Sequence, residues 1–71
     1  MVPTRPQLHL SNREREVLHW LTQGDSNQQI SEHLYITVAT VKAHLTSIFE
    51  KLKVTSRTQA IVAAVKLGLI P

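Results

Sequence analysis

The sequence contains no cysteine, only two glycines and three prolines, and no long apolar run. The absence of cysteine excludes a disulfide scaffold and a thiolate zinc site, which are the usual supports of very small secreted domains. The longest uninterrupted apolar run, residues 60–65, is far shorter than the roughly 18 residues of a membrane span, and the N-terminus lacks a signal-peptide pattern. We therefore expect a cytoplasmic protein with no membrane segment.

Length, composition and charge narrow the class further. A chain of 71 residues has room for one small domain and not for a multidomain enzyme. Hydrophobic residues make up 42% and charged residues 18%, which is typical of a folded globular domain. The net charge is −1 through residue 32 and +4 beyond it, where five basic residues stand against Glu50 alone. A basic second half is compatible with a surface that faces nucleic acid.

Helix-start signals divide the chain into four segments. Ser11, Ser26 and Ser56 are each followed three residues later by Glu or Gln, which is the capping-box pattern, and Thr37 is a further N-cap candidate. Apolar residues at helical spacing follow each cap, and a glycine after the first and last segments can supply a left-handed stop. The predicted helices cover residues 12–23, 27–34, 38–52 and 57–67. With no strand-like alternation, the fold class is all-α, a four-helix bundle.

Residues 1–9 contain two prolines and no apolar periodicity. We expect a tail or linker remnant there, followed by one helix-turn-helix domain over residues 10–71.

The third predicted helix carries the strongest periodic signal. Its apolar residues alternate at spacings of three and four: Val38, Val41, Leu45, Ile48 and Leu52. Only two residues join the second helix to the third, so the two helices must meet at a steep angle, which is the geometry of a helix-turn-helix. A rotation of 100° per residue then turns Lys42, Ala43 and Thr46 outward. Small and basic side chains let a helix enter the DNA major groove, although the same face could also be the solvated side of an ordinary bundle.

Several spaced motifs resemble the LuxR/NarL-type helix-turn-helix family. They are Leu10-Ser-x-Arg-Glu14-x-Glu-Val-Leu18, Gly24, Asn27, Ile30, Thr40-Val-Lys-x-His44 and Lys51-Leu52. The resemblance covers about residues 8–70, and a pattern of many parts is more specific than any single motif. It implies a DNA-binding domain that usually forms the C-terminal output module of a bacterial transcription regulator such as a response regulator. A regulatory domain would then precede this chain in the full-length protein.

The resemblance also implies which residues meet double-stranded DNA. Base contacts would come from the outward face of the third helix: Lys42, Ala43 and Thr46. Phosphate contacts would come from Asn27, Gln28, Thr40, His44 and Lys51, and these set register rather than sequence preference. His44 has an alternative place at the edge of the core. Glu14 matches a family position whose role here is that of a helix-cap partner.

Three positions depart from the family pattern. Tyr35 stands where the family often has glycine, so either the turn avoids positive φ or the helix-turn-helix holds some strain. Thr46 replaces a longer basic side chain of some relatives, and Lys53 stands where many have glycine. The base preference of a relative therefore does not transfer to this chain.

The fourth helix has two possible uses. Residues 60–65 are apolar on more than one side, so Val62, Ala63 and Val65 are candidates for the interface of a homodimer that reads two half-sites. Alternatively they are small residues at a crowded bundle edge. The second functional hypothesis is a helical protein–protein interaction module with little or no DNA binding.

No cofactor, metal site or catalytic site is expected. The histidines at positions 9, 19, 33 and 44 do not form metal-ligand spacing on one helix face. There is no nucleophile elbow and no glycine-rich phosphate loop, so an enzyme is not expected. Trp20 lies beside the first apolar stripe and is interpreted as a half-buried core aromatic rather than a base-stacking platform.

Overall fold

A computed structural model describes residues 9–69, so the predicted tail lies outside the described residues apart from His9. The four predicted helices are confirmed, and no strand occurs in this range. They are α1 (Asn12–Thr22), α2 (Asn27–Leu34), α3 (Val38–Leu52) and α4 (Arg57–Lys66). The first and last helices end one residue earlier than predicted because Gln23 and Leu67 are their C-caps. Gly24 and Gly68 then take positive φ and stop each helix, as expected.

Local caps start each helix. The capping boxes of α1 and α2 are complete, with Ser11 paired to Glu14 and Ser26 paired to Gln29. The third box forms only in part. Ser56 Oγ accepts from the Gln59 N–H at 3.1 Å, but Gln59 Oε1 accepts from the Thr55 N–H at 2.9 Å. The Gln59 side chain therefore caps one residue further back than the pattern predicts.

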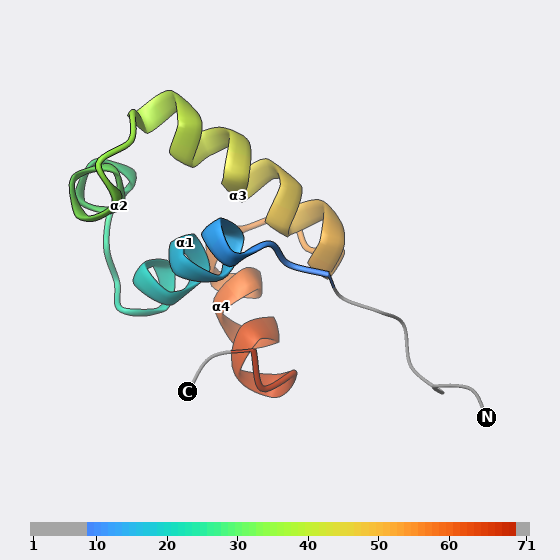
Figure 1. Cartoon of the computed structure of the whole chain (residues 1–71). Helices are drawn as coiled ribbons and strands as arrows, with labels where there is room; N and C mark the ends of the chain where they lie inside the picture. The colour runs from blue at the N-terminus through green and yellow to red at the C-terminus, as the bar shows by residue number, and fades with distance from the viewer. Residues whose placement is uncertain (1–8, 70–71) are drawn as a thin grey trace.

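The core lies between α3 and the other three helices, all of which pack against it. Figure 1 shows α3 along one side of the domain, with α2 near its N-terminal end and α1 and α4 on its inner side. The side chains that are fully shielded share the apolar stripes predicted from the sequence: Val17, Leu18, Leu21, Ile30, Val41, Ile48, Ala60 and Ala64. Because α4 contributes only the two alanines to this set, its backbone approaches the core closely.

Among the described residues, two non-glycine residues adopt the left-handed conformation. Tyr35, between α2 and α3, has φ 58° and ψ 42°, and Lys53, after α3, has φ 58° and ψ 46°. Of the two alternatives for Tyr35, positive φ is therefore the one adopted. Each of these conformations costs an L-residue about 1–2 kcal/mol relative to the right-handed region. The Tyr35 side chain is 94% exposed, so its packing offsets none of this strain.

Within the described part of the chain, no helix is long and apolar enough to cross a bilayer.

Candidate nucleic-acid interface

The outward face of α3 carries the three predicted base-contact residues. Lys42, Ala43 and Thr46 are all exposed, while Val41 and Leu45 beside them are buried. This face begins near the helix-turn-helix corner and lies opposite the buried residues of α3. Its N-terminal half carries small and basic side chains and no carboxylate, because the first acidic residue of α3 is Glu50. A helix with such a face can enter the major groove without steric or electrostatic repulsion.

Hydroxyl groups on this face already make local hydrogen bonds. Thr46 Oγ1 donates to the Lys42 carbonyl at 3.0 Å, so in this rotamer its lone pairs and methyl group remain available to a base. At the start of α3, Thr37 Oγ1 accepts from the Thr40 N–H at 3.1 Å and shares a 2.9 Å hydrogen bond with Thr40 Oγ1. The Thr40 hydroxyl is thus held at the helix start, where it is exposed. His44 is partly buried, so its exposure fits either of its two predicted places, a phosphate contact or the edge of the core.

The N-terminal end of α2 holds the next two predicted contacts. Asn27 is the first residue of the helix and Gln28 the second. Asn27 Oδ1 accepts from Arg57 Nη1 at 2.6 Å, and Gln28 Nε2 donates to Glu32 Oε2 at 3.1 Å. Sequence reasoning missed Arg57, which lies 30 residues further along the chain, because a pair so distant leaves no periodic signal.

Lys51 has a partner within the domain that the sequence did not predict. Its Nζ donates to Glu14 Oε1 at 2.7 Å and to the His9 carbonyl at 2.8 Å. An ammonium has three N–H donors, so one remains for a phosphate. Glu14 is 5% exposed and also accepts from Ser47 Oγ at 2.6 Å and from the Ser11 N–H at 2.9 Å. Glu14, the capping-box partner of Ser11, therefore also anchors the C-terminal end of α3.

This network stabilises the charged form of Glu14. Burial by itself raises the pKa of the carboxyl group, but the hydrogen bonds from Lys51, Ser47 and Ser11 outweigh it. Together with the positive charge of Lys51 they lower the pKa from 4.5 to about 2. Glu14 is consequently a carboxylate at neutral pH, and it neutralises Lys51, a lysine for which the family resemblance implies a phosphate contact.

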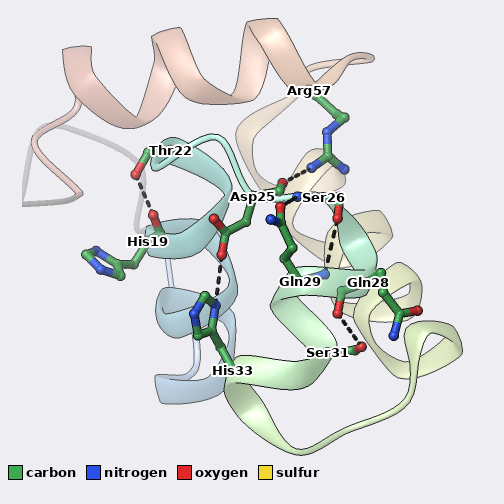
Figure 2. A network of polar contacts seen from close by, with 9 residues as sticks. All are labelled: His19, Thr22, Asp25, Ser26, Gln28, Gln29, Ser31, His33 and Arg57. Atoms are coloured by element: carbon green, nitrogen blue, oxygen red, sulfur yellow. Dashed lines mark hydrogen bonds and ion pairs between the residues drawn. The ribbon is translucent and has the colours of Figure 1, made fainter.

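A second polar cluster braces α1 against α2. The His33 ring stacks on Trp20 with centroids 3.8 Å apart. His33 Nδ1 lies 2.8 Å from Asp25 Oδ2, as Figure 2 shows. This carboxylate oxygen is buried, and in residues 9–69 the imidazole is its only polar partner. Trp20 is partly buried against the core, as predicted. The described residues include no group of three or more potential metal ligands.

The predicted dimer residues on α4 differ in exposure. Val62 and Val65 are 47% and 63% exposed, but Ala63 is partly buried and packs against the core. Leu67, the C-cap of α4, is 52% exposed. The large apolar side chains exposed on α4 are therefore Val62 and Val65, and Leu67 adds a third just after the helix.

Comparison with known proteins places this fold in a family. Residues 8–64 match the family of bacterial regulatory proteins, luxR family. The transcriptional regulatory protein DegU of Brevibacillus brevis is 47% identical over 70 residues, covering 97% of this chain and 30% of DegU. The transcriptional regulatory protein LiaR of Bacillus subtilis is 45% identical over 65 residues, covering 92% of this chain and 31% of LiaR. The chain thus spans less than a third of the length of these relatives.

Solved structures give the same fold. The response regulator ChrA of a heme-sensing two-component system superposes with a TM-score of 0.86 at 49% identity, covering 94% of this chain and 33% of ChrA. The transcription factor GerE superposes with a TM-score of 0.80 at 37% identity, covering 87% of this chain and 92% of GerE. Vibrio cholera VqmA, in a complex with ligand and DNA, superposes with a TM-score of 0.83 at 30% identity, covering 97% of this chain and 30% of VqmA. The chain, with its helix-turn-helix of α2 and α3, belongs to the luxR family of bacterial regulatory proteins.

Proposed function

We propose that this domain binds specific sequences in double-stranded DNA with α3 in the major groove, as the output domain of a bacterial transcription regulator. The observation that carries the proposal is the exposed face of Lys42, Ala43 and Thr46, which starts at a helix-turn-helix corner. A structural relative of 30% identity was solved in a complex with DNA, which supports the same use here.

The three proposed base-contacting residues make different kinds of contact with the bases. Lys42 donates to acceptors on base edges, and Ala43 contacts a thymine methyl. Because the Thr46 hydroxyl proton is directed to the Lys42 carbonyl, Thr46 offers a hydrogen-bond acceptor and a methyl group. The target site is therefore read partly by apolar contact, as expected for small side chains in a groove.

Phosphate contacts flank the base-reading face and set the register. Asn27 and Gln28 lie at the N-terminus of α2, Thr40 lies in the first turn of α3, and His44 and Lys51 lie further along it. Backbone N–H groups at a helix N-terminus add to such contacts. Lys51 takes part through the one donor that Glu14 and His9 leave open.

The domain acts as a homodimer on DNA, through Val62 and Val65, with Ala63 at the edge of the contact. Both valines are exposed and lie three positions apart on α4, so they share one face. Two copies read half-sites about one helical turn apart, and linkage of two weak contacts raises the affinity. In the full-length protein a regulatory domain precedes this chain, and action on chromosomal DNA places the regulator in the cytoplasm.

An amide chemical-shift titration with an arbitrary short duplex at low salt tests the proposal without a known target site, because non-specific binding uses the same docking face. We expect shifts at residues 27–28, 37–46 and 51–53 that fade as salt is added. A response confined to α4, or no response, would contradict the proposal and favour a protein–protein interaction module.

Single substitutions separate base contacts from phosphate contacts once a site has been selected from random duplexes. Lys42→Ala should weaken the selected site by roughly 1–3 kcal/mol and reduce discrimination against random DNA. Lys51→Ala should weaken both DNAs alike and lower the slope of affinity against salt by about 1. Lys66→Ala on α4 removes the same charge and is the matched control. Equal losses on both DNAs for Lys42→Ala would contradict its role in base reading.

A further inference from the structure

Arg57 connects the start of α4 to the start of α2. Its Nη1 donates to Asn27 Oδ1 at 2.6 Å, and its Nη2 donates to the Asp25 carbonyl at 2.8 Å. Figure 2 shows the guanidinium reaching from α4 to the loop that precedes α2. Both hydrogen bonds are partly buried. The planar fork of Arg57 thus holds a side chain and a backbone group at once, which a single ammonium cannot do in the same geometry.

The contact determines which edge of the Asn27 amide is open. A guanidinium has only donors, so it must face the amide oxygen. The NH2 group of Asn27, with two donors, is then the edge left for another partner. Without Arg57 the amide could turn its oxygen outward, and an oxygen would repel a phosphate.

The charge around this contact favours an anion. Arg57 is the first residue of α4 and bonds to the first residue of α2, and helix N-termini carry partial positive charge. Neither helix has an acidic residue in its first turn, and among residues 9–69 Arg57 has no carboxylate partner. The nearby carboxylate of Asp25 faces His33 instead. A cation at the positive end of a helix is unfavourable in the free domain, and a bound anion would relieve this repulsion.

We propose that Arg57 is a positioning residue for DNA, which fixes the Asn27 amide so that its NH2 group donates to a backbone phosphate. The inference rests on the DNA-binding function proposed above. It also links α4, the proposed dimer helix, directly to the helix that contacts phosphates.

Two variants test this role, and thermal unfolding checks that each is folded. Asn27→Asp keeps the acceptor for Arg57 and places a carboxylate at a helix N-terminus, so its thermal midpoint should equal or exceed that of the wild type. Its affinity for DNA should nevertheless fall by more than tenfold, because the donors are lost and a negative charge faces the phosphate. Arg57→Lys keeps the positive charge and removes the fork, so it should weaken binding roughly tenfold.

Whether Arg57 acts through Asn27 is tested by comparing the effect of Arg57→Lys in two backgrounds, the wild type and Asn27→Ala. The affinity of each variant, including the double variant, is measured by fluorescence anisotropy on one duplex. If Arg57 acts through Asn27, Arg57→Lys should change the affinity less than about twofold in the Asn27→Ala background. Equal losses in both backgrounds, full affinity of Arg57→Lys, or wild-type affinity of Asn27→Asp would each overturn the inference while DNA binding stands. Absence of binding by the wild-type domain would overturn the proposed function and the inference together.

Discussion

Replacement of Glu14 by glutamine should remove much of the pH dependence of folding in the acid range. Glutamine keeps the shape of the side chain and one acceptor oxygen, but it cannot carry the charge that faces Lys51 at 2.7 Å. The Glu14 side chain is 7% exposed, so solvent screens this interaction little. Removal of the charge leaves the ammonium of Lys51 without its counter-ion.

The size of the effect follows from the pKa of Glu14. That pKa is about 2 in the folded domain against 4.5 ordinarily, which corresponds to about 3 kcal/mol of folding free energy. Because the folded pKa is the lower one, this stability is present above pH 4.5 and is lost as the pH falls toward 2. Between pH 6 and pH 3 the wild type should lose about 2 kcal/mol through Glu14. At neutral pH we expect Glu14→Gln to lower the unfolding free energy by about 2 kcal/mol.

Urea unfolding followed by circular dichroism at a series of pH values measures both quantities. Glu16→Gln is the matched control on the same helix, since Glu16 is 54% exposed and pairs with Arg13 on the surface. It should change the unfolding free energy by less than about 0.5 kcal/mol. If Glu14→Gln kept the wild-type difference between pH 6 and pH 3, the attribution of acid sensitivity to Glu14 would be refuted.

Two further substitutions test the turn and the dimer surface. Tyr35→Gly should raise the unfolding free energy by about 0.5 kcal/mol and the thermal midpoint by a few degrees, because glycine adopts positive φ without strain. Tyr35→Ala keeps the strain and is its control, and a lower midpoint for the glycine variant would contradict the reasoning. Val65→Glu should leave the thermal midpoint unchanged and weaken binding to a duplex with two half-sites but not to one with a single half-site. Equal losses on both duplexes would argue against a dimer contact there.

The helices could be predicted from the sequence because their signals are local. A cap and its partner are three residues apart, and a buried stripe repeats every three or four residues, so both are visible along the chain. The third capping box shows the limit of such a pattern. Thr55 offers an N–H group next to that of Ser56, and only the geometry of the turn decides that Gln59 accepts from Thr55.

The polar contacts between helices could not be predicted in the same way. Glu14 and Lys51 are 37 residues apart, and Arg57 and Asn27 are 30 apart. Each of these residues also has a plausible exposed role, so the type of residue does not reveal its partner. The conformation of Tyr35 could not be predicted either, because local preference disfavours positive φ and yet the turn between α2 and α3 adopts it.

The two ends of α3 should respond differently to substitution. Lys42, near the N-terminal end, is exposed and makes no side-chain hydrogen bond within the described residues, so its removal should lower DNA affinity without lowering stability. Lys51, near the C-terminal end, donates to Glu14 and to the backbone where the chain enters the domain, so one ammonium serves both folding and docking. Loss of Lys51 should therefore lower both quantities together. Glu14→Gln removes the counter-ion of Lys51 while it destabilises the fold. At a temperature where the variant is folded, its phosphate affinity should therefore not decrease.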